Sequence, residues 1–320
     1  MIIVTGCNGF IGSNLVSQLN KLGFKNIIGV DDLSKKENLL NIAHCEIAEL
    51  LDIEEFERDY LQKDNSLSQV EKIFHQGACS DTMEWDAEYI IKNNYSFSQK
   101  LLDFAERNSI AFIYASSAAV YGDGKEFEEI RENENPINLY AFSKYLFDQL
   151  VRQKITDNKI QIVGLRYFNV YGPNESHKGH MASVAYHLHE QLKEGKDVQL
   201  FEGSGGFGPG EQRRDFIYVD DVVKVNLWFM NQPDISGIFN VGTGKSQTFN
   251  EVAKAVIEWH GKGSIRYIPF PKELIDSYQS FTEANIDKLR QAGYQEDFLD
   301  LQSGVKLYLD RLQNWPKNAS

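Results

Sequence analysis

The sequence predicts an α/β fold, in which a doubly wound parallel sheet is joined to a smaller, mainly C-terminal α/β domain. Three observations support this prediction: short apolar runs alternate with amphipathic stretches, a glycine-rich turn follows the first run, and the alternation becomes irregular in the second half. Strands that alternate with helices imply right-handed crossovers, so that helices cover both faces of a parallel sheet.

The expected strands and helices follow from the spacing of apolar residues. In the first half we expect strands at residues 2–5, 27–31, 72–75, 111–116 and 161–166. The stretches between them that have helical spacing are residues 11–22, 86–108 and 139–154. In the second half we expect helices at residues 181–194, 219–230 and 249–259, and one more strand of the sheet at residues 238–241.

The composition excludes several classes of protein. A chain of 320 residues has room for two domains, and its formal net charge of −13 disfavours nucleic acid, which binds a basic face. No apolar run approaches the roughly 18 residues of a membrane-spanning helix, and no basic leader precedes the first strand-like run, so we expect a cytoplasmic protein without a membrane partner. Cys7, Cys45 and Cys79 lack metal spacing and are expected as free thiols, and we expect no metal.

A glycine-rich turn at residues 5–12, Thr-Gly-Cys-Asn-Gly-Phe-Ile-Gly, lies between the first expected strand and the first expected helix. Such a turn lets the backbone approach a pyrophosphate and points a helix N-terminus at its charge. The Gly-x-x-Gly-x-x-Gly spacing resembles that of the extended short-chain dehydrogenase/reductase superfamily, which implies a Rossmann-type domain that binds a nicotinamide dinucleotide. The residues of this turn expected to contact the dinucleotide are Gly6, Gly9, Phe10, Ile11 and Gly12.

The residues alone leave the choice between NAD and NADP open. Asp31 and Asp32 end the second expected strand, where a carboxylate accepts from the adenosine ribose and repels a 2′-phosphate. Lys35 and Lys36 follow at once and are able to hold that phosphate. The superfamily resemblance implies further cofactor contacts after the third expected strand, in the central helix and later in the chain. These residues are Gln76, Gly77, Ala78, Cys79, Ser80, Asn93, Lys144, Val170 and Lys178.

A serine, a tyrosine and a lysine form the expected catalytic group. Tyr140 and Lys144 lie four residues apart in a helical pattern, which places both side chains on one face. Ser116 ends an expected strand, and ligands of open parallel sheets bind at the edge where the strands end. A tyrosine that removes a hydroxyl proton needs a pKa below its usual value of about 10, and a nearby ammonium lowers it. We therefore expect Tyr140 as acid/base, Lys144 as its ammonium and Ser116 as the residue that orients the substrate oxygen.

The segment that follows Ser116 and Ser117 narrows the range of reactions that the chain is expected to catalyse. Nucleotide-sugar dehydratases of the extended short-chain dehydrogenase/reductase superfamily carry an Asp-Glu pair there, and this chain has Ala118 and Ala119 instead. Elimination of water therefore lacks its general acid and base, which leaves an epimerase or a simple dehydrogenase.

Several later segments are similar to those of nucleotide-sugar epimerases, over nearly the whole chain. They include residues 166–173 (Arg-Tyr-Phe-Asn-Val-Tyr-Gly-Pro), 177–179 (His-Lys-Gly), 181–185 (Met-Ala-Ser-Val-Ala) and 201–204 (Phe-Glu-Gly-Ser). The pattern most resembles the epimerases that act on an ADP-heptose for the lipopolysaccharide inner core. The resemblance implies bound NADP, transient oxidation at C6″, Lys178 as a second acid/base, and a homo-oligomer, with a pentamer as one form. It implies substrate contacts by Ser116, Asn169, His180, His187, Phe201, Glu202, Gly203, Ser204, Arg214 and Tyr278.

These inferences divide the chain by task and leave two alternative functions. We expect a dinucleotide-binding domain at residues 1–167, to which residues 215–247 return, and a substrate-binding domain at residues 168–214 and 248–320. The glycine-dense stretch at residues 203–210 is either a surface insertion or a flap over a ligand. The alternatives are a UDP-hexose 4-epimerase, which has no need of Lys178, and a non-catalytic dinucleotide-binding scaffold.

Overall fold

The computed structural model describes residues 1–62, 69–156, 159–271 and 279–314. The chain divides into two compact units, each built from several segments. Unit 1 consists of Met1–Val120, Asn138–Arg166 and Val223–Phe239, and unit 2 consists of Tyr121–Ile137, Tyr167–Val222 and Asn240–Ser320.

A seven-stranded sheet forms the centre of unit 1, in the order β11-β6-β5-β4-β1-β2-β3. Its strands are β1 (Ile2–Thr5), β2 (Ile27–Asp31), β3 (Glu49–Asp52), β4 (Lys72–His75), β5 (Ala111–Ser117), β6 (Ile162–Tyr167) and β11 (Gly237–Val241). Strand β1 pairs in parallel with both β2 and β4, so the strand order reverses beside β1. Ligands of doubly wound sheets bind at the carboxyl end of such a reversal. The predicted fold class is confirmed.

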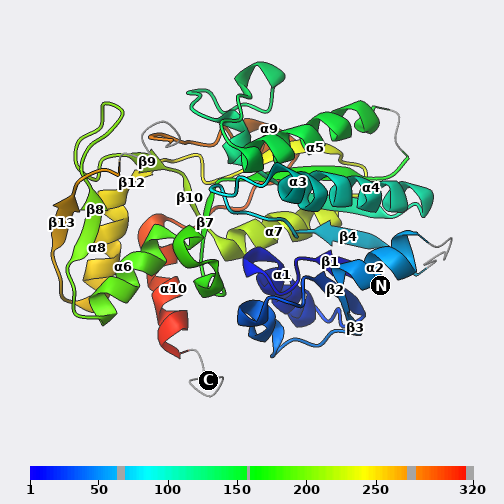
Figure 1. Ribbon diagram of the computed structural model, residues 1–320, viewed down its shortest axis with the longest axis horizontal. Helices are drawn as coiled ribbons and strands as arrows, with labels where there is room; N and C mark the ends of the chain where they lie inside the picture. The colour runs from blue at the N-terminus through cyan, green and yellow to red at the C-terminus, as the bar shows by residue number, and fades with distance from the viewer. Residues whose placement is uncertain (63–68, 157–158, 272–278, 315–320) are drawn as a thin grey trace. The chain divides into compact units, whose positions relative to one another are not determined.

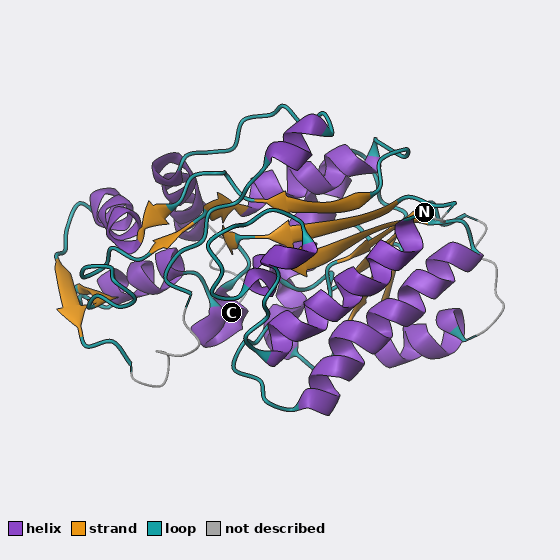
Figure 2. Cartoon of the chain, turned by 90° about the horizontal axis from the view of Figure 1, so that it is seen from above, coloured by secondary structure: helices purple, strands orange, loops and turns teal. Residues whose placement is uncertain are grey.

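Helices cover both faces of this sheet, as Figure 2 shows. Helix α1 (Phe10–Lys21) lies on one side, and α4 (Phe97–Arg107) and α5 (Leu139–Ile155) lie on the other (Figure 1). Their apolar faces bury side chains against the strands, and the Phe147 ring of α5 meets the Tyr114 ring of β5 edge-on at 4.8 Å. Each fully buried side chain of this size contributes about 1.5–3 kcal/mol to folding.

The predicted helix at residues 86–108 is continuous in direction but not in its hydrogen bonding. It consists of α3 (Ala87–Ile90), a π-helical segment at Ile91–Ser96, and α4. A π-helical turn inserts one extra residue per turn and often occurs at functional sites. Within this segment Asn94 is buried, whereas the preceding Asn93 is only partly buried.

The described residues of unit 2 form three two-stranded sheets and a group of helices. Strand β7 (Asn169–Tyr171) pairs with β10 (Phe216–Tyr218), β8 (Val198–Phe201) with β13 (Ile265–Ile268), and β9 (Arg213–Arg214) with β12 (Gln247–Thr248). Helix α8 (Phe249–His260) packs against both α6 (Val184–Lys193) and α10 (Leu301–Asn314) (Figure 1). The short helix α9 (Asp287–Gln291) precedes α10, and α7 (Val219–Met230) links the two units in sequence.

Helix α8 shows how local sequence sets the ends of these elements. Thr248 and Glu251 form a reciprocal capping box at its start, and Gly261 ends it in the left-handed conformation, at φ 64°. The predicted helix at residues 249–259 is confirmed. Among the described residues no helix is long and apolar enough to cross a membrane.

Candidate active site

The glycine loop between β1 and α1 forms a turn that excludes side chains. Gly6 has φ +67°, and a Cβ there would lie 2.6 Å from the Cα of Gly77. A Cβ on Gly12 would lie 2.0 Å from the Gly6 carbonyl oxygen. Helix α1 begins after Gly9, which has no side chain to cap the first turn. This turn has the bare backbone and the uncapped helix start that a dinucleotide pyrophosphate requires.

Cys7, an unusual residue inside such a loop, is accommodated by a glycine on the neighbouring strand. Its side chain is fully buried, and a Cβ on Gly29 would lie only 2.8 Å from the Cys7 sulfur. Burial raises the pKa of this thiol well above its usual value. Cys7 is therefore a packing residue and not a reactive thiolate.

The two acids that follow β2 have different surroundings. The Asp31 carboxylate accepts from the backbone N–H groups of Asn8 (2.7 Å) and Asp32 (2.8 Å), and burial raises its pKa against the effect of those bonds. Asp31 thus holds the glycine loop in place. The Asp32 carboxylate accepts from the Ser34 hydroxyl and lies 3.6 Å from the exposed Lys35 ammonium. Of the two predicted ribose acceptors, Asp32 is the more accessible.

Hydrogen bonds join the loop after β4, residues 76–80, to the glycine loop and to the π-helical segment Ile91–Ser96. The backbone N–H of Gly77 donates to the Thr5 hydroxyl at 3.3 Å. The Asn94 amide binds both the N–H (2.8 Å) and the carbonyl (2.9 Å) of Cys79. The predicted Asn93 instead donates to the Tyr89 carbonyl of its own helix. Asn94, which the sequence analysis missed, is the asparagine that positions this loop.

The two serines at the end of β5 have different hydrogen-bond partners. The buried Ser116 hydroxyl donates to the Asp148 carboxylate at 2.9 Å. The half-buried Ser117 is hydrogen-bonded to the Tyr140 hydroxyl and accepts from the Ala119 N–H at 3.1 Å. Strand β5 runs one residue further than predicted, so Ser117 and not Ser116 ends it. Ser117, and not the predicted Ser116, is therefore the serine whose hydroxyl meets Tyr140.

Tyr140 and Lys144 lie on one face of α5, as predicted, but their ionisation differs from the expectation. Burial raises the pKa of Tyr140, and the Ser117 hydrogen bond offsets only part of that effect. The Lys144 ammonium donates to the Ala115 carbonyl at 2.9 Å, and burial lowers its pKa to about 8. In the chain alone the phenol keeps its proton, and the lysine rather than the tyrosine titrates near neutral pH.

These contacts separate the effects of two neighbouring substitutions. We expect Ser117→Ala to lower turnover by about 10²-fold, since it removes the hydroxyl that is hydrogen-bonded to the acid/base. Ser116→Ala should lower the free energy of unfolding by about 1–3 kcal/mol, because the buried Asp148 carboxylate loses a donor. Its effect on turnover should be much smaller. Steady-state kinetics and thermal unfolding of both variants measure this difference. A larger loss of turnover in Ser116→Ala would contradict the assignment.

Lys178 lies in unit 2, in the turn Ser176–Met181 between β7 and α6. Burial lowers the pKa of its ammonium, and the carboxylate of Glu175 partly opposes that effect. Glu175 is itself fully buried and accepts from the N–H (2.6 Å) and hydroxyl (2.7 Å) of Ser183 and from the Gly172 N–H (3.2 Å). Its carbonyl accepts the Lys178 N–H at 3.0 Å. Glu175, another residue that the sequence analysis missed, therefore fixes the turn that carries Lys178.

Part of the predicted substrate set is brought together within unit 2. Gln212 donates to the Glu202 carbonyl and the Ser204 hydroxyl, both at 3.1 Å, which ties residues 201–204 to the strand that carries Arg214. The Asn169 N–H donates to the carbonyl of Asp215, the neighbour of Arg214. The Arg214 guanidinium is buried above the Phe249 ring at 5.8 Å. Asn169, Arg214 and residues 201–204 thus lie on adjoining segments.

The remaining predicted residues of unit 2 lie in β7, in the turn of Lys178 and on α6, and one lies outside the described part of the chain. Val170 is in β7, His180 is exposed in the turn of Lys178, and His187 packs beside Tyr186 on α6. Tyr278 lies outside the described residues. The glycine-dense stretch is closed at its base by a hydrogen bond from the Gly210 N–H to the Phe201 carbonyl.

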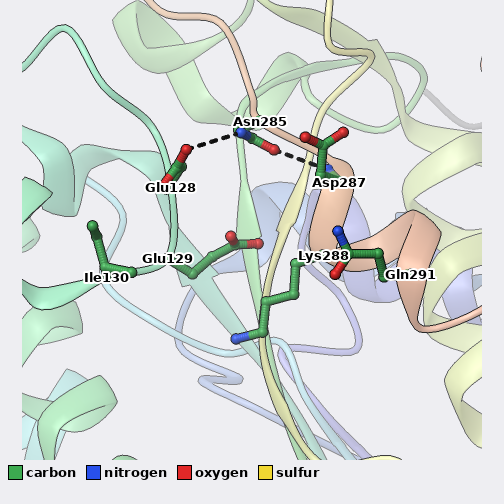
Figure 3. A pocket seen from close by; sticks show the side chains of 7 residues that line it. All are labelled: Glu128, Glu129, Ile130, Asn285, Asp287, Lys288 and Gln291. Atoms are coloured by element: carbon green, nitrogen blue, oxygen red, sulfur yellow. Dashed lines mark hydrogen bonds between the residues drawn. The ribbon is translucent and has the colours of Figure 1, made fainter.

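A separate pocket in unit 2 does not suit an anionic ligand. Figure 3 shows its lining residues, Glu128, Glu129, Ile130, Asn285, Asp287, Lys288 and Gln291. Three of them are acids against one lysine, and none is a predicted site residue. Among the described residues no cluster of three or more His, Cys, Asp or Glu side chains is arranged to hold a metal ion.

Comparison with known proteins agrees with the fold. Residues 2–242 match the NAD dependent epimerase/dehydratase family. The chain is 51% identical to the ADP-L-glycero-D-manno-heptose-6-epimerase of Alkalilimnicola ehrlichii, over 99% of this chain and 98% of that protein. The crystal structure of the Helicobacter pylori enzyme of the same name has a TM-score of 0.82 and 33% identity, over 98% of this chain and 96% of that one.

A 4-epimerase is also similar, at lower identity. The structure of Thermus thermophilus UDP-glucose 4-epimerase with NAD has a TM-score of 0.79 and 26% identity, over 98% of this chain and 99% of that one. The family match covers the glycine loop, Ser117, Tyr140 and Lys144. This chain belongs to the NAD dependent epimerase/dehydratase family.

Proposed function

We propose that this chain inverts C6″ of ADP-D-glycero-D-manno-heptose to the L-glycero form, by transient oxidation and re-reduction, in lipopolysaccharide inner-core synthesis. The observation that carries the proposal is 51% identity to a relative named for this reaction, extending over both units. UDP-hexose 4-epimerases share the fold at 26–28% identity and are the second candidate. The intact Ser117, Tyr140 and Lys144 contacts argue against a non-catalytic scaffold.

Three side chains of unit 1 are of the types that carbinol oxidation uses. A bound nicotinamide ring supplies the chemistry of hydride removal and return. Tyr140 holds or accepts the proton of the reacting oxygen, and Ser117 orients that oxygen through its bond to the phenol. The Lys144 ammonium would stabilise the phenolate once the phenol has given up its proton, and it would hold the cofactor ribose. Lys178 is the second acid/base, which exchanges a proton with the reacting oxygen after the oxidised sugar has rotated in the site.

We propose NADP as the resident cofactor, held by the glycine loop, Asp32 and residues 76–80. Lys35 supports this choice, because its exposed ammonium lies beside Asp32 and offsets the repulsion of a 2′-phosphate. Nucleotide released from the purified protein and weighed by mass spectrometry identifies it. Recovery of NAD alone would overturn the choice of NADP.

We further propose the division of tasks predicted from the sequence, with residues 1–167 and 215–247 for the cofactor and residues 168–214 and 248–320 for the sugar nucleotide. The family resemblance also leads us to propose a cytoplasmic homo-oligomer.

The substrate is tested by offering two nucleotide sugars separately to the purified protein. NMR follows the C6″ stereocentre of ADP-D-glycero-D-manno-heptose and the C4″ stereocentre of UDP-galactose. We expect inversion of the first and none of the second. Inversion at C4″ of UDP-galactose alone would establish the 4-epimerase instead.

A further inference from the structure

A buried polar cluster lies beneath the catalytic face of α5, centred on Asp148. One carboxylate oxygen accepts from the Tyr114 hydroxyl at 2.8 Å. The other accepts from the Ser116 hydroxyl at 2.9 Å and from the Arg166 guanidinium, at 2.9 Å to Nε and 2.8 Å to the terminal nitrogen. Asp148 and Arg166 are both completely inaccessible to solvent. Four donors therefore hold one ionised carboxylate in the core of unit 1.

This carboxylate is connected to the reacting residues in two ways. Asp148 lies one helical turn after Lys144 and two turns after Tyr140, so the three share one face of α5. Its bond to Ser116 anchors the end of β5, where the next residue, Ser117, meets the Tyr140 hydroxyl. We propose that Asp148 is a positioning residue for the hydride chemistry: it keeps Lys144 charged and directs Ser117, rather than Ser116, toward Tyr140.

The charges around Lys144 support the electrostatic part of this role. Burial lowers the pKa of Lys144 to about 8, and Asp148 is the first of the groups that raise it again, followed by Cys79. His75 also interacts with the Lys144 charge, and burial lowers the pKa of its imidazole to about 3, so that it stays neutral. Tyr140 keeps its proton because burial raises its pKa. Asp148 is thus the group that does most to oppose the effect of burial on the pKa of Lys144.

The inference rests on the proposed function, but its main test does not need turnover. Protein labelled with 13C at the lysine ε-carbon is titrated by NMR, and the Lys144 signal is assigned by its absence in Lys144→Met. Asp148→Asn should lower the pKa of Lys144 by about one unit, as expected for the loss of a nearby opposite charge. In active protein the alkaline limb of kcat/KM should move to lower pH by the same amount.

Tyr114→Phe is the matched control, since it removes a neutral donor from the same carboxylate and leaves the charge in place. The pKa of Lys144 should not fall in this variant. If Asp148→Asn fails to fold because Arg166 loses its counter-ion, Asp148→Asn with Arg166→Gln removes both charges and should lower the pKa of Lys144 in the same direction.

The outcomes of the two readouts are distinct. An unchanged Lys144 titration in the folded Asp148 variants, or an equal fall in Tyr114→Phe, would overturn the role of Asp148. If the unchanged protein does not turn over the ADP-heptose, while the pKa of Lys144 falls in Asp148→Asn and not in Tyr114→Phe, the result would count against the proposed function alone.

Discussion

Replacing Tyr140 by phenylalanine should lower kcat by about 10²-fold or more, the usual effect of losing a positioned acid/base. The phenol is hydrogen-bonded to Ser117, and burial raises its pKa, so it holds the proton that the reaction must move. Phenylalanine keeps the ring and its packing on α5 and removes only the hydroxyl. The kinetics of epimerisation of the ADP-heptose, measured with saturating substrate, give the loss directly.

The comparison needs a folded variant that still holds its cofactor. Circular dichroism and the amount of nucleotide retained after purification should match those of the unchanged protein. A kcat close to that of the unchanged protein would show that another group moves the proton.

Replacing Lys178 by methionine should abolish epimerisation while the cofactor stays bound. The reason is that a sugar that has turned over presents its reacting oxygen to a different acid/base. Burial lowers the pKa of the Lys178 ammonium, which makes it a better proton donor. Glu175 holds the turn that carries Lys178 in place. Methionine keeps the length of the side chain and removes the amine. The measurements are turnover of the ADP-heptose and retention of the nucleotide.

Lys196→Met is the matched control for this change, because Lys196 is an exposed lysine of unit 2 whose ammonium pairs with Glu194 at 2.5 Å. It should epimerise at the rate of the unchanged protein. Equal rates for Lys178→Met and Lys196→Met would show that Lys178 is not an acid/base of the reaction.

The sequence predicted most of the sheet of unit 1 because its strands are apolar runs separated by amphipathic helices. It missed β3 and all of the described short strands of unit 2. Strand β9 has two residues and β7 has three, and such segments are too short to show a period. Their pairing is set by contacts far along the chain, such as β8 with β13, which no local pattern contains.

The candidate site was predictable where chemistry depends on local spacing, and less so where it depends on register. The glycine loop and the Tyr140–Lys144 pair follow from spacing alone. The choice between Ser116 and Ser117 depends on a single residue at the end of β5, and side chains of successive strand residues point to opposite faces. The choice between Asn93 and Asn94 depends on a π-helical segment that has no clear sequence signal. Asp148, four residues after Lys144, was visible as a third residue on the same helix face.

The central claim is that the hydrogen removed from C6″ is the one returned to its opposite face. ADP-D-glycero-D-manno-heptose carrying deuterium at C6″ tests it most directly, with the reaction run in ordinary water and the product examined by NMR and mass spectrometry. The account predicts L-glycero product that keeps the deuterium at C6″. Product of inverted configuration that has exchanged its deuterium for solvent hydrogen would contradict it.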